Sequence, residues 1–167
     1  TAVLDRLYNI LFQKAMDTKP GEPLLVPFFF EVTEEDRSRA AFGKIFYYSF
    51  LTQYLAVKCK KPQWANERFS RSKLIKIAEK FRFKTILDDL ECFEEGITEG
   101  DGEIIWEHAA GAPHRIAAKT GDFFLQIIDE FQFLNKYVFS DERLTRQINL
   151  AGTYHNLSES RIAPQRI

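Results

Sequence analysis

The sequence predicts an α/β domain in which helices flank a parallel sheet. Two apolar, aromatic runs, residues 24–32 and 123–130, have the length and composition of buried strands. Segments with the helical spacing of apolar residues precede and follow the first run. This alternation of helix and strand is typical of a parallel sheet with crossover helices. With 167 residues, the chain is expected to form one domain, 1–167, around one core.

The N-terminal part is predicted as helix, strand and helix. Apolar side chains recur every three to four residues from the start to about Met16, which predicts the first helix. The strand over residues 24–32 contains Pro27, which donates no ladder hydrogen bond, so we expect this strand at or near a sheet edge. Residues 33–36, Thr-Glu-Glu-Asp, offer a cap and an acidic first turn for a second helix that continues to about residue 57.

Residues 58–118 are expected to form a mostly helical insert with two blocks of opposite charge. The basic block, from Lys58 to Lys84, has ten Lys or Arg and two acids, whereas residues 85–107 have nine Asp or Glu and no Lys or Arg. The basic block is either a surface for a nucleic-acid or protein partner or a solvated insert that folds back on its acidic neighbour. Shorter elements expected in the insert are a strand at residues 104–106, a break at 111–113 and a helix near 115–119.

The C-terminal part is predicted to contain a turn and a further helix. Residues 131–137 are expected to form a loop or helical turn beyond the second strand. A helix over residues 141–151 comes next, with Ser140 as its N-cap and Gly152 at its end. Residues 161–167 are predicted to approach another strand.

Composition and charge exclude several classes of protein. Hydrophobic residues make up 45% of the chain, so it is globular and not disordered. A net charge of −1 argues against a chain that wraps nucleic acid over its whole surface. Cys59 and Cys92 are too few for a disulfide framework or a zinc cluster, which favours a cytoplasmic setting. No apolar run reaches the roughly 18 residues of a membrane span, so no membrane association is expected.

The second apolar run ends in two adjacent carboxylates, Asp129 and Glu130. Open α/β sheets bind their ligands at the carboxyl ends of the strands, so this pair is the candidate functional site. The alternative is that both are solvated acids at a strand end. A third interpretation, a hydrolase that uses the two as an acid/base pair, lacks a supporting nucleophile.

Residues 125–135, Leu-Gln-Ile-Ile-Asp-Glu-Phe-Gln-Phe-Leu-Asn, resemble the Walker B region of prokaryotic, archaeal-type ATPases of the AAA-like and STAND groups. In that family a DEFQ run comes directly after the strand. Residues 159–164 resemble the family's lead into the strand that carries a polar sensor residue, and residues 1–7 resemble the segment after the Gly-Lys pair of its Walker A loop. The resemblance implies a three-layer, P-loop NTPase-like parallel sheet and a partial ATPase domain over 1–167.

The resemblance is most specific over residues 122–167, weaker over 1–57 and absent over about 58–118. The chain contains no G-x-x-x-x-G-K-S/T motif, and Lys119-Thr120 is preceded by Ala118 where the motif requires glycine. Without that loop and its lysine to cradle phosphates, we expect poor ATP affinity and no hydrolysis by these residues alone. The resemblance therefore assigns ATP hydrolysis to a longer parent protein.

The resemblance implies ATP and Mg²⁺ as cofactors and a role for three residues. Asp129 would hold Mg²⁺ directly or through a water, since Mg²⁺ prefers few carboxylates and several waters. Glu130 would polarise the attacking water. Thr1 would be the hydroxyl residue of the Walker A loop and would bind the metal and the nucleotide.

Other polar residues have weaker signals. Four arginines are candidates for stabilising the transition state, each with surface ion pairing as the alternative: Arg37, Arg39, Arg143 and Arg161. Three histidines share no spacing and are interpreted as ordinary polar residues: His108, His114 and His155. The alternative function is a non-catalytic α/β module that binds a protein or nucleic acid through the basic block.

Overall fold

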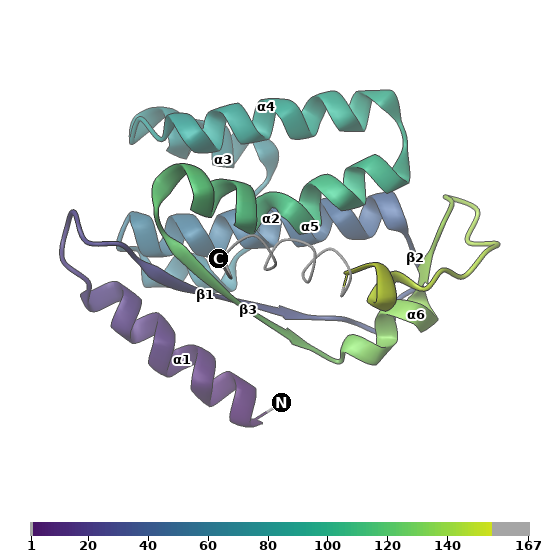
Figure 1. Ribbon diagram of the computed structural model, residues 1–167, viewed down its shortest axis with the longest axis horizontal. Helices are drawn as coiled ribbons and strands as arrows, with labels where there is room; N and C mark the ends of the chain where they lie inside the picture. The colour runs from purple at the N-terminus through teal and green to yellow at the C-terminus, as the bar shows by residue number, and fades with distance from the viewer. Residues whose placement is uncertain (1, 155–167) are drawn as a thin grey trace, which may run out of the picture.

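A computed structural model describes residues 2–154 and has an α/β architecture (Figure 1). The described strands form two parallel pairs, β1–β3 and β2–β4, so the α/β class and parallel strands expected from the sequence are confirmed. The elements are α1 (Ala2–Asp17), β1 (Leu25–Glu31), β2 (Arg37–Ser38), α2 (Arg39–Lys58), the 3-10 helix η1 (Pro62–Asn66), α3 (Arg71–Lys80), α4 (Lys84–Glu99), α5 (Gly102–Thr120), β3 (Phe123–Asp129), the 3-10 helix η2 (Phe131–Phe133), α6 (Leu134–Tyr137) and β4 (Val138–Phe139).

The β1–β3 pair is the centre of the fold, and its register places Glu31 beside Asp129. On the side of β1 away from β3, the side-chain amide of Gln53 in α2 takes the place of another strand. Its oxygen accepts the backbone N–H of Phe29 at 3.0 Å, and its nitrogen donates to the Phe29 carbonyl at 2.8 Å. Within the described part of the chain β1 is therefore an edge strand, in agreement with the presence of Pro27.

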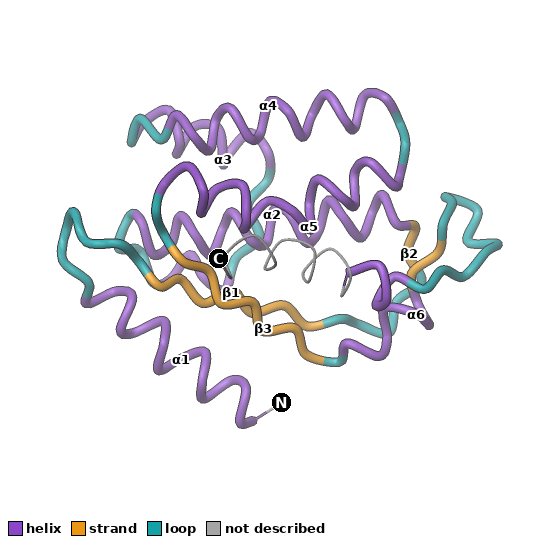
Figure 2. Tube along the Cα trace, viewed as in Figure 1, coloured by secondary structure: helices purple, strands orange, loops and turns teal. Residues whose placement is uncertain are grey.

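Helices pack on both faces of the β1–β3 pair, as Figures 1 and 2 show. On one face lies α1, whose Tyr8 contacts Phe29 with ring centroids 5.8 Å apart. On the other face lies α2, where Phe28 meets Phe46 and Phe50 edge-on at 5.1 and 5.4 Å. Edge-to-face contacts of this kind add specific geometry to the burial of large apolar surfaces. The aromatic runs of the sequence are therefore core residues.

The 20-residue helix α2 is enclosed by β1 on one side and α5 on the other. It carries apolar residues all around, as expected of a buried helix. Helix α5 approaches α2 closely at Gly43, where a Cβ atom would lie 3.3 Å from the Cα of Trp106. Trp106 is almost wholly buried and contacts Phe42 with ring centroids 5.4 Å apart. The small residue at position 43 thus permits the contact between the two helices.

Asp122, just before β3, is a buried carboxylate that joins both long strands to α2. It accepts the backbone N–H of Leu24 at 3.1 Å and the hydroxyl of Tyr54 at 2.7 Å, and it pairs with the Lys58 ammonium at 2.8 Å. Burial alone raises the pKa of Asp122, but these three donors outweigh burial and lower it from its usual value. One carboxylate therefore links the starts of β1 and β3 to the last turns of α2.

Asp89 of α4 is a second buried carboxylate and links α4 to α2 and α5. It accepts the hydroxyl of Tyr47 at 2.8 Å and two guanidinium N–H groups of Arg115 at 2.9 and 3.2 Å. The Nε2 atom of His108 lies 3.7 Å from its Oδ2. Burial raises the pKa of Asp89, but His108, Arg115 and Tyr47 together lower it to about 2.

The predicted start of the second helix is wrong. Helix α2 begins at Arg39, after Ser38, whose hydroxyl accepts the N–H of Ala41 at 3.1 Å as an N-cap. Residues 33–36 do not cap this helix. Between residue 36 and the start of α2 the chain forms β2, whose Arg37 pairs with Val138 of β4. The long-range pairing of β2 delays the helix, and no local signal marks it.

The predicted strand at residues 104–106 and the break at 111–113 are also wrong. Both segments lie in α5, which also contains residues 115–119. A short apolar run cannot be told from a buried helical segment by its pattern alone. Pro113 removes one helical hydrogen bond, at a cost of about 3 kcal/mol, and the burial of this helix against α2 offsets it.

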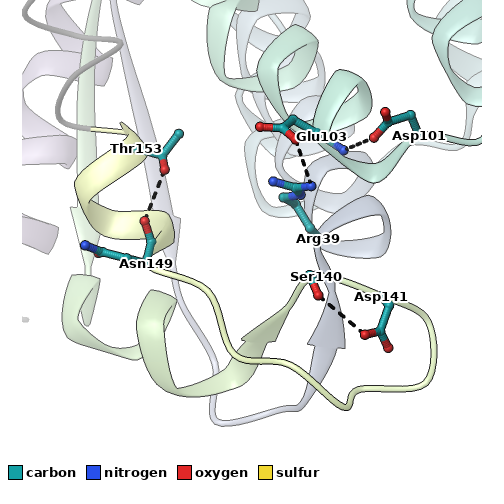
Figure 3. Close-up of polar contacts among 7 residues, drawn as sticks. All are labelled: Arg39, Asp101, Glu103, Ser140, Asp141, Asn149 and Thr153. Atoms are coloured by element: carbon teal, nitrogen blue, oxygen red, sulfur yellow. Dashed lines mark hydrogen bonds and ion pairs between the residues drawn. The ribbon is translucent and has the colours of Figure 1, made fainter.

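The predicted helix over residues 141–151 is wrong over most of its length. Asp141 accepts the N–H of Arg143 at 2.9 Å and the hydroxyl of Thr145 at 2.7 Å, and these bonds hold a turn in place of a helix. Ser140 donates its hydroxyl to Asp141 and caps no helix (Figure 3). Helical structure occurs at residues 150–154, so Gly152 does not end it.

Three further expectations concern the C-terminal turn, the chain end and the membrane. The helical turn over residues 131–137 is confirmed as η2 and α6. The predicted approach to a strand at 161–167 lies outside the described residues. No helix between residues 2 and 154 has both the length and the apolarity that a membrane span requires.

Replacement of Asp122 by Ala should destabilise the fold strongly. The change leaves the Lys58 ammonium and the Leu24 N–H without their acceptor, and we expect a loss of about 3 kcal/mol in the free energy of unfolding. Urea denaturation measures this loss, with an unchanged m-value as the sign of a two-state comparison. The exposed control Glu22→Ala should change stability by less than about 0.5 kcal/mol. Equal stabilities of the two variants would contradict the role of Asp122.

The Asp89 cluster should make stability depend on pH in the acid range. Because the pKa of Asp89 is lowered on folding, its contribution is fully present above its unfolded pKa of about 4 and is lost as the pH falls toward 2. The free energy of unfolding of the wild type should exceed that of Asp89→Asn by about 2 kcal/mol at pH 6. This difference should become smaller between about pH 4 and pH 2. Urea denaturation across pH measures both, with the half-buried neighbour Asp88→Asn as the control. A gap independent of pH would refute this assignment.

Candidate functional site

The two predicted carboxylates lie at the carboxyl end of β3. Asp129 is the last residue of the strand and is 8% exposed, and Glu130 comes next and is half-buried. Glu31, at the end of β1, is the register partner of Asp129 and brings a third carboxylate to this edge. Sequence reasoning missed Glu31, although Glu31 follows the aromatic residues of the first run just as Asp129 follows the apolar residues of the second run.

The strand that carries Asp129 is buried only toward this end. Phe123 is 64% exposed and Leu125 is 39% exposed, whereas Ile127 is buried. The expectation of a strand covered on both faces is therefore not met at Phe123 and Leu125. The reason is that, among the described residues, α1 packs mainly against β1 and leaves the first residues of β3 without a cover.

Both the backbone and the side chain of Asp129 are held in place. Its carbonyl accepts the N–H of Val32 at 3.1 Å, which extends the β1–β3 ladder by one bond. Its Oδ1 accepts the N–H of Glu130 at 3.0 Å. The carboxyl group is thus fixed at the end of the strand, next to the residue that turns the chain out of the sheet.

Glu130 is that turning residue, and its backbone is in the left-handed region at φ 55° and ψ 34°. A side chain in this conformation costs about 1 kcal/mol. Strained backbone of this kind is concentrated at functional sites. Gln132 donates its Nε2 hydrogen to Glu130 Oε2 at 2.5 Å and so orients the carboxylate. Sequence reasoning gave Gln132 no role beyond its place in the DEFQ run.

Helix α1 packs on one face of the β1–β3 pair, where Tyr8 lies beside Phe29. It runs opposite to β1 and diverges from the strands toward its N-terminus in the view of Figure 1. Its N-terminus, the positive end of the helix dipole, is the end of α1 nearer the carboxyl ends of the strands. Thr1, the predicted hydroxyl ligand, lies outside the described residues.

Within residues 2–154, no three His, Cys, Asp or Glu side chains gather as a ligand set for a metal ion. Asp129 alone of the predicted metal ligands is described. One carboxylate fits Mg²⁺, because Mg²⁺ in nucleotide sites takes most of its ligands from water and phosphate oxygens. It does not fit an ion that needs a cage of protein ligands.

Two of the candidate arginines form ion pairs with residues outside the carboxylate edge. Arg37 forms an ion pair with Glu35, and Arg39 lies 3.5 Å from Glu103 (Figure 3). Arg143 is exposed, in the turn that Asp141 holds. For the first two, the structure shows surface ion pairing, the alternative to a role in catalysis.

The histidines do not join the carboxylates. His108 lies beside Asp89, and His114 is exposed on α5. His155 and Arg161 lie outside the described residues.

A cleft of about 320 Å³ opens beside the carboxyl half of β1, on its Gln53 side. Its walls come from β1 and the residues after it up to Arg37, from α2, from residues 65–68 and from residues 137–138. Glu31 lines it, but Asp129 and Glu130 do not. The two predicted site residues therefore lie on the β3 side of the edge, apart from this cleft.

No protein-family model, curated protein or solved structure matches the chain.

The strain at Glu130 can be measured by substitution. Glu130→Gly should be more stable than Glu130→Ala by about 1 kcal/mol, because glycine adopts a positive φ without the steric cost of a Cβ atom. Urea denaturation of the two variants gives the difference. The same pair of substitutions at Glu95, on a regular turn of α4, should favour alanine. A glycine variant that is the less stable at position 130 would contradict the left-handed assignment.

Proposed function

We propose that the chain is the nucleotide-binding part of an ATPase that resembles the P-loop ATPases of the AAA-like and STAND groups, and that the protein hydrolyses ATP with Mg²⁺. One observation carries the proposal. A buried Asp129 and a turned-out Glu130 stand side by side at the carboxyl end of a parallel strand, where α/β sheets bind ligands. The positive end of the α1 dipole is the end of that helix nearer this edge, and it favours an anionic ligand.

In this proposal the β1–β3 pair belongs to a larger, three-layer P-loop-like sheet. The exposure of Phe123 and Leu125 supports a further neighbour for β3, because apolar strand residues are normally covered. Helices on both faces of the pair are also in keeping with such a sheet. Cys59 and Cys92 are free thiols, which supports a cytoplasmic setting.

The residues of the proposed site would divide the work. Asp129 would hold Mg²⁺, with Thr1 as a further ligand, and the ion when bound neutralises charge on the phosphoryl oxygens. Glu130 would accept a hydrogen bond from the attacking water and orient it. Gln132 would hold the Glu130 carboxylate in the required direction. The phosphate-binding loop would come from outside the 167 residues, because they contain no such motif.

Glu130→Gln should separate nucleotide binding from turnover. In the protein that combines this chain with its phosphate-binding loop, the variant should keep its affinity for Mg-ATP within about threefold, because the amide is isosteric and touches no phosphate. Turnover should fall by about 100-fold or more, because the amide orients water poorly and accepts no proton. The rate of phosphate release measures the turnover, and a nucleotide-binding titration measures the affinity for Mg-ATP.

The matched control is Glu22→Gln, which makes the same change at an exposed acid outside the proposed site and should leave both quantities unchanged. Full turnover in Glu130→Gln would remove Glu130 from its role. If Asp129→Asn leaves Mg-ATP binding unaffected, Asp129 does not hold the Mg²⁺ ion.

A further inference from the structure

Eight of the ten cations of the basic block fall into two groups in the structure, and the exposed Arg68 and Lys76 belong to neither. Four of the ten cations have partners within the fold. Lys60 donates to three carbonyls at the end of α1, those of Ala15, Met16 and Thr18, at 2.7–3.0 Å. The other three form ion pairs: Lys58 with Asp122, Arg71 with Glu94, and Lys73 with Glu67. Of these, the Arg71–Glu94 pair joins the basic block to its acidic neighbour.

A second group gathers where α3 turns into α4. It contains Lys61, Lys80, Arg82 and Lys84, which are all exposed and form no ion pair within the described residues. Lys61 follows the end of α2 by three residues, and its charge acts with that of Lys80 on the thiol of Cys59, the C-cap of α2. Burial raises the pKa of this thiol to about 11, and the charges of Lys61 and Lys80 both oppose that rise.

Two phenyl rings lie among these cations. Phe81 is 40% exposed and stacks on Phe83, with ring centroids 5.8 Å apart and planes 12° from parallel. The Nζ atom of Lys80 lies 5.7 Å from the centre of the Phe81 ring. We name Phe81 and the four cations the α3–α4 corner. An exposed ring within a group of cations is the combination that binds single-stranded nucleic acids, with bases on the ring and phosphates on the cations.

The corner also departs from local structural preferences. Arg82 has a φ of 57°, at a helix end where the Phe83 N–H donates back to the Ala78 carbonyl at 2.8 Å and glycine is the usual residue. Helix α4 starts at Lys84 with neither a side-chain cap nor an acid in its first turn, although the helix dipole disfavours a cation there. Such departures are expected where function selects the residue.

We propose that the α3–α4 corner binds single-stranded nucleic acid, with one base stacked on Phe81 and the neighbouring phosphates held by Lys61, Lys80, Arg82 and Lys84. An acidic peptide could form ion pairs with the cations, but its carboxylates would not stack on the exposed Phe81 ring. Glu79 and Asp88 flank the corner, so the positive field is local and the site is short. The corner shares no residue with the proposed ATPase site and does not depend on it.

Fluorescence anisotropy of a labelled oligothymidylate of about 15 nucleotides, titrated with the 167-residue chain, tests the proposal. We expect binding at low salt that weakens steeply as salt is raised. Arg82→Gly should weaken binding about tenfold without lowering the melting temperature, because glycine suits the left-handed position. Lys84→Glu should weaken it at least as much. Phe81→Ala should weaken it with little change in the salt dependence.

The matched control is Arg143→Glu, which makes the same charge change in the exposed 140–147 turn at the opposite end of the fold and should leave the affinity unchanged. The proposal is overturned by an absence of binding at low salt. It is equally overturned if Arg143→Glu weakens binding as much as Lys84→Glu, since net charge alone would then be responsible. If polyglutamate binds with the same affinity as the oligothymidylate, the proposal of nucleic acid as the ligand is overturned in favour of an acidic protein partner.

Discussion

The hydrogen bonds of the Asp122 carboxylate are the constraint on which the rest of the structure depends. They fix the starts of β1 and β3 against each other and against α2. A parallel pair that slips by one residue turns every side chain to the opposite face. The bond from Leu24 to Asp122 prevents that slip at one end of the pair, and the two bonds between Gln53 and Phe29 prevent it further along. The place of Asp129 at the far end of β3 is a consequence of this register.

The buried helix α2 determines where function can lie. Its aromatic side chains fill one face of the β1–β3 pair, and its contact with α5 leaves no room for a ligand between them. Gln53 lies at the outer edge of β1 and hydrogen-bonds the N–H and the carbonyl of Phe29, which would otherwise be buried without partners. The carboxyl edge of the strands, the cleft on the Gln53 side of β1 and the outer surface of the insert remain accessible, and the two proposed sites lie at the first and the last of these.

Four non-glycine residues have a positive φ within the described part of the chain: Lys60, Arg82, Glu130 and Leu144. Leu144 lies in the turn that Asp141 holds, so local hydrogen bonds account for it. The ammonium of Lys60 caps the end of α1, so the fold itself accounts for this residue as well. The side chains of Glu130 and Arg82 cap none of the described helices, and each residue lies where charge is concentrated at a chain reversal. Their conformational cost is consistent with selection for the proposed functions rather than for stability.

The sequence by itself determined the elements whose signals are local. The spacing of apolar residues predicted α1, and the aromatic runs with Pro27 predicted β1 and β3. The second apolar run, which stops at Asp129 and Glu130, predicted that these acids lie at the end of a strand, because a buried strand ends where charged residues begin. The tertiary structure alone decided the rest. Burial against α2 kept residues 104–113 helical, pairing with β4 delayed α2, and the side chain of Asp141 replaced a helix with a turn. Register brought Glu31 to the edge, and folding of the insert divided most of its cations into two groups. These outcomes depend on contacts between residues far apart in the chain, whose energies exceed local propensities and leave no periodic pattern in the sequence.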